Sequence, residues 1–355
     1  MSDADALKLT TYFGERDRTG ERFLADALAE LYARHRLRAS LVMRGVEGFG
    51  VKHHLHTDRL LTLSEDLPIV SVAVDLRARI EAVLEEVVAL FGDGLITLER
   101  ARMPDAAAVA DVDEETKLTV YLGRGERAGG RPAHTAVVGA LHRQGVAGAT
   151  VLLGVDGTVR GERRRARFFA SNAQVPLMVV AVGAGERIAA ALPELRALLA
   201  EPLVTLERVR VCKRDGRRLA VPEALAATNP SGLAMWQKLM VYCGEQSRHA
   251  QRPLYLELVR ALRTAGAAGA TALRGTWGYH GDHAPHGDSL WQLRRRVPVV
   301  TVIVDTPERI ARWFAVVDEL TDETGLVTSE QVPALRATGP GIARGGLRLA
   351  DPGVR

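Results

Sequence analysis

The feature that most constrains this chain is a short phrase that occurs three times. KLTTYFGER begins at Lys8, KLTVYLGRGER at Lys117 and KLMVYCGEQ at Lys238. A glycine lies 40 residues after the first lysine of each phrase. A proline that opens an apolar run follows that glycine by 20, 19 and 20 residues in the first, second and third copies. A glutamate in an L-x-T-x-E phrase comes 31, 31 and 32 residues after the proline. Such regular spacing predicts three copies of one folding unit.

Each unit has the same order of predicted elements. In the first unit the phrase is rich in Thr, Tyr and Phe, as a strand is, and residues 20–35 carry an apolar helical stripe. A second strand at 39–45, the apolar run PIVSVAVD at 68–75, a helix at 77–91 and the L-x-T-x-E strand complete it. The order β-α-β-β-α-β predicts an α+β, ferredoxin-like unit, with a four-stranded antiparallel sheet and two helices on one face. The bare sheet face requires a partner.

Length and spacing together predict the domain boundaries. A chain of 355 residues exceeds what one hydrophobic core serves, and its 47% apolar and 25% charged content is ordinary for a globular protein. The predicted segments are, in order, repeat 1 at 7–104, repeat 2 at 116–212, repeat 3 at 236–332 and a disordered tail at 333–355. Residues 101–115 and 211–234 are interpreted as linkers.

Cysteine content and the N-terminus bear on location. Cys212 and Cys243 give neither a disulfide framework nor a metal-binding spacing, and reduced thiols are expected. The N-terminus lacks the order of a signal peptide, and no apolar run approaches the roughly 18 residues of a membrane span. We therefore expect a cytoplasmic protein.

These phrases resemble a known family. KLTTYFGERDRTG, VMRGVEGFG, HLHTDRLLTLSEDLPIV and LITLER are similar to the PII-like family of uncharacterised domains called domain of unknown function 190, and repeats 2 and 3 keep the skeleton but not all of the loops. PII signalling proteins are ferredoxin-like trimers whose bare sheet faces pack inward. The resemblance implies a single-chain pseudo-trimer, a monomer that mimics a trimer.

The resemblance also implies where a ligand binds. In PII proteins the loop between the second and third strands contacts effectors and moves when a nucleotide binds between subunits. The residues predicted to bind ligand lie at or in this loop: Arg44, Gly45, Gly48, Gly50, His56, Gly154, Gly157, Arg274, Gly275, Gly278 and His286. Glycines let backbone N–H groups approach an anion, and arginine offers a forked donor. The alternative is that the glycines merely end a strand and begin a loop.

Histidines concentrate in two of these loops. His53, His54 and His56 lie in repeat 1, and the equivalent loop of repeat 3 contains His280, His283 and His286. These histidines, with Asp282 and Asp288, have ligand types that suit zinc. A pH-responsive or phosphate-contacting loop and a plain solvated loop are the alternatives. We assign no metal site.

Other charged residues receive structural interpretations. The phrase lysines, and Glu15, Glu126 and Glu245 near the far end of the phrase, are expected to be solubilising or capping residues, and Asp75 and Asp305 to be N-caps of the second helix. The sequence contains no G-x-S-x-G, P-loop or nucleophile pattern. We therefore assign no catalytic residues and expect that the protein is not an enzyme.

The leading functional hypothesis is a regulatory protein. Clefts between repeats would bind a small anionic metabolite, with an adenine nucleotide as a candidate and no required cofactor, and the loops would signal to a membrane transporter or an enzyme. Two alternatives remain. One is RNA binding through the sheets, although the apolar third strands lack the aromatics this needs, so no nucleic-acid partner is expected. The other is a metal-dependent enzyme that uses the histidine loops.

Overall fold

The three repeats form a mixed helix-and-sheet structure built from antiparallel sheets. The computed structural model describes residues 4–50, 56–57, 66–104, 115–166, 172, 174–280, 285–287, 297–338 and 343–349. Within those residues there are six helices, two in each repeat: α1 Leu24–Arg34, α2 Arg77–Leu90, α3 Ala133–Arg143, α4 Gly185–Leu198, α5 Leu254–Ala265 and α6 Pro307–Leu320. The predicted three-fold repeat and the predicted combination of helices with antiparallel sheets are confirmed.

Each repeat orders its four main strands in the same way. In repeat 1 the order across the sheet is β4 (Ala39–Arg44), β7 (Pro68–Leu76), β1 (Ala4–Gly14) and β8 (Asp93–Met103). In repeat 2 it is β12 (Gly148–Leu153), β15 (Pro176–Ala184), β9 (Glu115–Gly123) and β16 (Leu203–Arg208). In repeat 3 it is β22 (Ala270–Arg274), β25 (Pro298–Asp305), β19 (Gln237–Gly244) and β26 (Leu326–Gln331). Neighbouring strands within each repeat are antiparallel.

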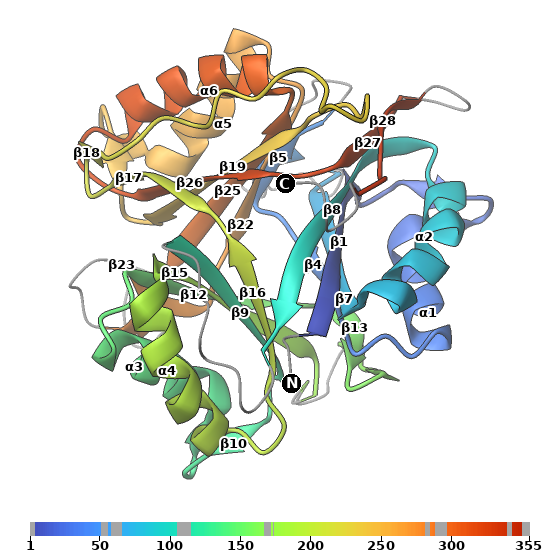
Figure 1. Ribbon diagram of the computed structural model, residues 1–355, viewed down its shortest axis with the longest axis vertical. Coiled ribbons are helices and arrows are strands. Elements are labelled where there is room, and N and C mark those ends of the chain that lie inside the picture. Colours follow the sequence, from blue (N-terminus) through green and yellow to red (C-terminus); the bar gives the residue numbers. More distant parts are fainter. Residues whose placement is uncertain are drawn as a thin grey trace.

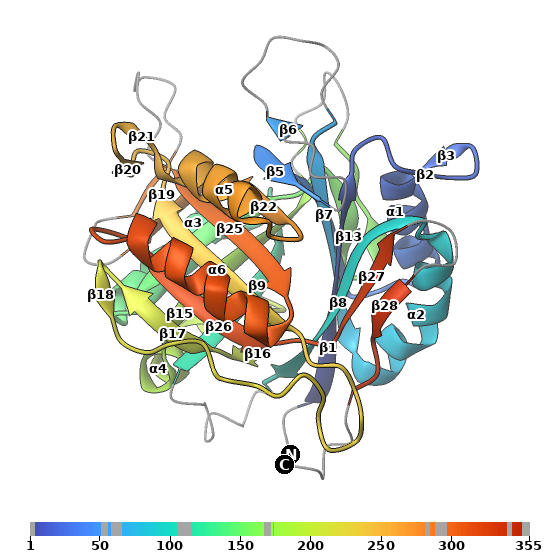
Figure 2. The same cartoon turned by 90° about the horizontal axis from the view of Figure 1, so that it is seen from above.

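The apolar third strands are buried on both faces of the sheet. Successive side chains point to opposite faces, so each strand contributes to two cores. In β7, Ile69 and Ala73 pack under the helices of repeat 1, whereas Val70, Val72 and Val74 join a second core. That second core collects side chains from all three repeats, and each repeat keeps a separate core under its helices. Figures 1 and 2 show the same arrangement: three pairs of helices lie outside and the strands lie inside.

A short strand after the second main strand of each repeat crosses to a neighbouring repeat. We call these strands the arms: β5 (Glu47–Phe49), β13 (Asp156–Val159) and β23 (Trp277–His280). The arm β5 pairs with β22 of repeat 3, β23 pairs with β12 of repeat 2, and β13 pairs with β4 of repeat 1. The pairings therefore run in a closed cycle through the three repeats.

Segments expected to be irregular join this pairing. Residues 333–355 were predicted to be disordered, but β27 (Ala334–Thr338) pairs with β8 of repeat 1 and with β28 (Ala343–Gly346). In the predicted linker 211–234, β17 (Arg210–Arg214) pairs with β26 and with β18 (Arg217–Arg218). Both predictions are wrong for those residues, because an open strand edge on another repeat supplies hydrogen bonds that local sequence does not reveal.

The two predicted N-caps are also corrected. The N-cap residues of α2 and α6 are Leu76 and Thr306, and neither helix has a side-chain cap. Asp75 instead accepts hydrogen bonds from the backbone N–H groups of Arg38 and Leu76, and Asp305 accepts one from the indole of Trp313. Asp75 therefore ties the start of α2 to the segment before β4, whereas Asp305 joins the end of β25 to α6.

A ring of six buried charges lies where the three sheets meet. It contains the three phrase lysines and the glutamates of the three L-x-T-x-E phrases, and each lysine lies opposite its own repeat's glutamate on the neighbouring strand. We call this set the charge ring: Lys8, Glu99, Lys238, Glu330, Lys117 and Glu207. The N–O distances are 2.9 Å for Lys8–Glu99, 3.0 Å for Lys238–Glu99, 2.9 Å for Lys238–Glu330, 2.6 Å for Lys117–Glu330 and 3.0 Å for Lys117–Glu207, and Lys8 also contacts Glu207. The lysines are therefore not solubilising residues.

Alternation of charge explains how these groups remain ionised in the interior. Burial alone raises the pKa of Glu330, but the ammonium groups of Lys117 and Lys238 outweigh it and lower the pKa to about 2. Burial likewise opposes the charge on Lys8, yet Glu207 and Glu99 raise its pKa well above the ordinary value. Lys117, only 1% exposed, is the exception, because desolvation outweighs its carboxylate partners and lowers its pKa. Each charge depends on partners from two repeats.

Replacing Lys117 with methionine should strongly destabilise the protein. The substitution keeps an unbranched side chain but leaves Glu207 and Glu330 buried with one partner fewer each. Breaking a buried ion pair in this way costs about 3–5 kcal/mol, measured as the free energy of unfolding in urea. The control is Glu308→Gln, which removes an exposed ion pair with Arg312 and should cost about 0–1 kcal/mol. Equal losses in the two variants would contradict the assignment.

The charge ring should also make the free energy of unfolding decrease as the pH falls. The pKa of Glu330 falls from 4.5 in the unfolded chain to about 2 in the folded one, so its contribution is present above pH 4.5 and is lost as the pH falls toward 2. This one group should contribute roughly 3 kcal/mol across that window. Urea unfolding at about pH 6 and about pH 3 would measure the loss, and Glu330→Gln should show a flatter dependence. An equally steep dependence in that variant would refute the assignment.

Candidate ligand-binding clefts

Three of the predicted glycines lie where an arm crosses a neighbouring repeat. Gly48, Gly157 and Gly278 each occupy an arm strand. A Cβ at these positions would lie 2.8 Å from Ala270 O, 1.9 Å from Ser40 O and 2.2 Å from Ala149 O, respectively. Gly157 and Gly278 also have φ values of +148° and +154°, which L side chains rarely adopt. These glycines are required for close approach of two repeats.

The other predicted glycines turn the chain into the arm. The backbone N–H groups of Gly45, Gly154 and Gly275 donate to the carbonyl oxygens of the prolines that open the third strands, at 2.7, 2.9 and 2.7 Å. These three glycines therefore have a backbone role where a strand ends and a loop begins, and anion binding by them stays a prediction. Gly50 differs, because it has open space around its Cα and lines a cavity.

The predicted arginines are held within their own repeats. Arg44 forms an ion pair with Glu15 at 2.7 Å, and Arg274 forms one with Glu245 at 2.9 Å. Neither is among the residues that line the cavity described below. Each ion pair ties the end of the second strand to the turn after the first strand.

The histidine loops fall mostly outside the described residues. His53, His54 and His283 lie outside them, as do Asp282 and Asp288. The backbones of His56 and His286 form β6 (His56–Thr57) and β24 (His286–Gly287), which pair with the arms of their own repeats, but their side chains are not described. Among the described residues, no group of three or more His, Cys, Asp or Glu side chains could hold a metal ion.

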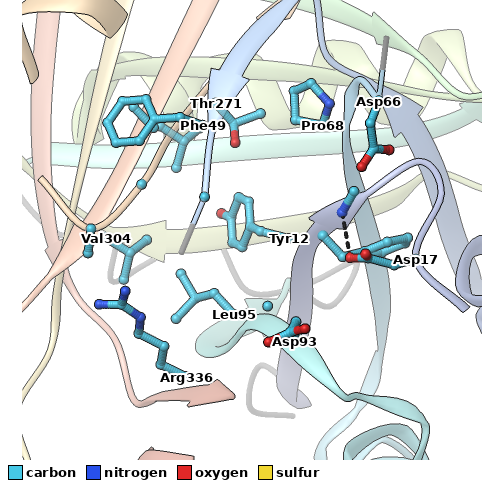
Figure 3. A pocket seen from close by; sticks show the side chains of 18 of the residues that line it. Tyr12, Asp17, Phe49, Asp66, Pro68, Asp93, Leu95, Thr271, Val304 and Arg336 are labelled. Atoms are coloured by element: carbon cyan, nitrogen blue, oxygen red, sulfur yellow. Dashed lines mark hydrogen bonds between the residues drawn. The ribbon is translucent and has the colours of Figure 1, made fainter. Parts of the chain in front are cut away.

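A cavity of about 220 Å³ lies between repeats 1 and 3. Repeat 1 contributes the end of β1, the residues Phe49 and Gly50 after its arm crossing, and the start of β8. Repeat 3 contributes residues 268–271 at the start of β22 and Val302 and Val304 of β25. In Figure 3, Tyr12 stands in the middle of the cavity, with Phe49 and Thr271 on one side and Leu95 on the other. The cavity is thus an inter-repeat cleft at the base of the repeat 1 loop.

Two buried donors in this cleft lack a hydrogen-bond acceptor within the described part of the chain: Nε1 of Trp236, which is 6% exposed, and Nε of Arg336. Burial lowers the pKa of Arg336, and Asp305 only partly opposes this. In Figure 3 its side chain extends from the C-terminal strand β27 toward Val304. A desolvated guanidinium and an indole N–H beside a cavity favour an anionic ligand.

Carboxylates line the same cavity. Asp17 accepts a hydrogen bond from the Gly14 N–H at 2.7 Å, and Asp66 accepts one from the Arg16 N–H at 2.7 Å. Asp93 lies at the start of β8. In the view of Figure 3, Asp17 and Asp66 lie at the end of the cavity away from Arg336. In the described part of its lining, the cleft therefore has one basic and several acidic side chains.

The equivalent cleft between repeats 1 and 2 is nearly closed, with a volume of about 10 Å³. Tyr121 lies in it as Tyr12 does in the larger cleft, since each is the tyrosine of its phrase. Arg160 lies here as well and forms ion pairs with Glu126 at 3.1 Å and Glu201 at 3.4 Å. The repeats have therefore diverged at the clefts that their common fold creates.

Sequence reasoning missed Trp236 and Arg336. Trp236 directly precedes the third phrase, and Arg336 lies in the segment predicted to be disordered. Of the predicted ligand-binding residues, Gly50 lines the cavity. A further signal in the sequence is the recurring tyrosine of the phrase, since Tyr12 and Tyr121 occupy equivalent cleft positions.

Two further findings concern cysteines and hydropathy. Cys212 and Cys243 are free and buried, and burial raises the pKa of each thiol to about 12.

In the described part of the chain, no helix has the length and apolar character to cross a membrane.

Comparison with known proteins gives one family and few relatives. The family described as "Uncharacterized ACR, COG1993", domain of unknown function 190, matches residues 6–103, 115–211 and 236–334. A UPF0166 protein of Aquifex aeolicus (strain VF5) is 31% identical over 98 residues, which are 27% of this chain and 90% of that protein. The crystal structure of aspartate kinase from Synechocystis aligns with 96% of this chain and 46% of its own, at 13% identity and a TM-score of 0.24, which is too low to carry an argument.

Replacing Gly278 with alanine should weaken the contact between repeats 2 and 3. The new Cβ would lie 2.2 Å from the carbonyl oxygen of Ala149, at a φ of +154°. Strain of this kind costs on the order of 1–3 kcal/mol, measurable as the free energy of unfolding in urea. Gly92→Ala is the matched control, because a Cβ there meets nothing within 4 Å. Indistinguishable unfolding midpoints would show that the arm does not need glycine.

Proposed function

The chain belongs to the PII-like family of domain of unknown function 190, in three tandem copies, and on that premise we propose that it is a regulatory sensor. In this proposal a small anionic metabolite binds in a cleft between repeats, and the neighbouring loop passes the bound state to a protein partner. An adenine nucleotide is the first ligand class to test, because the family resemblance implies it.

Three features support a single-chain pseudo-trimer of ferredoxin-like units. The strand order within each repeat is that of a ferredoxin-like sheet. The arms pair in a cycle, and the sheet faces turned away from the helices share one core. A covalent trimer fixes the stoichiometry and lets each cleft diverge, as the clefts of 220 and 10 Å³ have done.

The observation that carries the ligand proposal is the buried Nε of Arg336, which has no acceptor among the described residues and belongs to a side chain that lines the 220 Å³ cleft. Leaving a buried donor without an acceptor is costly, so a structure that retains one is explained by an acceptor that arrives from outside. Trp236 adds a second donor of the same kind. An anionic group would satisfy both.

Signalling follows from the position of the cleft. Phe49 and Gly50 line it and belong to the segment that joins the second and third main strands of repeat 1. A ligand that contacts these residues can favour one loop arrangement over another, which is the free-energy requirement for a switch. By family analogy the partner is a membrane transporter, a channel or an enzyme. We place the protein in the cytoplasm because both of its cysteines are free and buried.

The RNA-binding alternative loses support from the buried sheet faces. Tyr121 and Tyr242 are 5% and 6% exposed, so bases could not stack on these strands without opening the central core.

Isothermal titration calorimetry with ATP, ADP, AMP, cyclic AMP and simple carboxylates tests the proposal. We expect binding at the cleft between repeats 1 and 3 and not at the nearly closed cleft between repeats 1 and 2. Arg336→Gln should weaken binding about tenfold or more, since a hydrogen bond to a charged group contributes roughly 1.5–3 kcal/mol.

Arg312→Gln, on the exposed face of α6, is the matched control and should bind as the wild type does. Thermal melting of each variant confirms folding. If no anion binds, or if a folded Arg336→Gln variant binds equally well, the sensor proposal fails.

A further inference from the structure

The distribution of charge in the cleft between repeats 1 and 3 restricts its ligand more narrowly than an anion. Among the described residues that line the cavity, the acidic side chains of Asp17, Asp66 and Asp93 outnumber the one basic side chain, Arg336. Placing a polyphosphate beside three carboxylates brings like charges together, which is unfavourable. A ligand that carries one negative and one positive group matches the lining better.

The carboxylates can accept further hydrogen bonds from a ligand. Each ionised carboxylate has about four acceptor positions. Asp17 accepts a hydrogen bond from the Gly14 N–H and Asp66 accepts one from the Arg16 N–H, and neither bond saturates a carboxylate. All three are half-buried, so their charges are less screened than charges on an open surface.

The size of the cavity also favours a small ligand. Pockets for drug-sized molecules hold roughly 300–1,000 Å³, and this one holds about 220 Å³. Its walls between the charged groups are apolar, with Tyr12, Leu95, Val302 and Val304 among them. The ligand therefore needs a compact apolar body between or beside its charged groups.

We propose that the cleft binds a small zwitterion with one carboxylate, one ammonium group and a compact apolar body, of the amino-acid type. Its carboxylate accepts hydrogen bonds from Arg336, and its ammonium group faces the acidic rim formed by Asp17, Asp66 and Asp93. This inference rests on the proposed function and names the ligand class for the same site. It also assigns β27 a role, since this strand at the end of the third repeat brings the anion-binding arginine to the first.

Calorimetry with matched analogues tests the ligand class. Leucine is compared with 4-methylpentanoate, which lacks the ammonium group, and with 3-methylbutylamine, which lacks the carboxylate. The set 6-aminohexanoate, hexanoate and hexylamine tests a wider separation of the two charges. In at least one set the zwitterion should bind about tenfold or more tightly than either analogue.

Two variants assign the contacts. In Arg336→Gln the zwitterion should no longer bind more tightly than the amine. In Asp93→Asn the difference in affinity between the zwitterion and the carboxylate should become smaller. Arg312→Gln again serves as the control, and thermal melting establishes that each variant is folded.

The outcomes separate this inference from the proposed function. If simple carboxylates or nucleotides bind as tightly as the zwitterions do, the zwitterion assignment is wrong and the anion sensor remains. If no zwitterion, carboxylate or nucleotide binds to the wild-type protein, both proposals fail.

Discussion

An alternating ring of six buried charges holds the centre of this fold, and each charge has one partner in its own repeat and one in a neighbour. Desolvating these groups is unfavourable, and alternation offsets that cost only when all three repeats are present in the correct register. A one-residue slip in any phrase strand would turn its lysine toward the helices. The charge ring therefore specifies the three-way arrangement, while the shared apolar core supplies most of the burial.

Periodicity made the repeat and the helices predictable. Equal spacing identified three units, and the predicted helix at 77–91 matches α2, Arg77–Leu90, because apolar stripes and strand-like runs are local signals. The charge ring was not predicted, although Lys8 and Glu99 recur at matching positions in every repeat. A lysine judged alone at a strand start is ordinarily solvated, and its burial follows only from the meeting of three sheets.

The candidate site was less predictable than the fold. The predicted ligand-binding residues lie in the arms and at the base of the loop, and Gly50 is the one among them that lines the cavity. Gly48, Gly157 and Gly278 allow close backbone approach between repeats, and ligand contact by any of these glycines stays a prediction. Arg336 could not be inferred, because its role depends on β27 pairing with an open strand edge in repeat 1. Likewise, Arg160 lines the equivalent cleft and forms ion pairs there with Glu126 and Glu201, which no short motif describes.

The cyclic arrangement has a consequence for how the chain reaches its folded state. Charge-ring partners such as Lys8 and Glu207 are 199 positions apart, and Lys117 and Glu330 are 213 apart. A topology dominated by such distant contacts folds slowly, because loop-closure entropy is lost before those contacts form. During synthesis, the first repeat emerges with two of the six ring charges and with an edge of β8 that later pairs with β16 and β27. Native assembly therefore waits for repeat 3 and β27, and a nascent chain must stay free of aggregation until then.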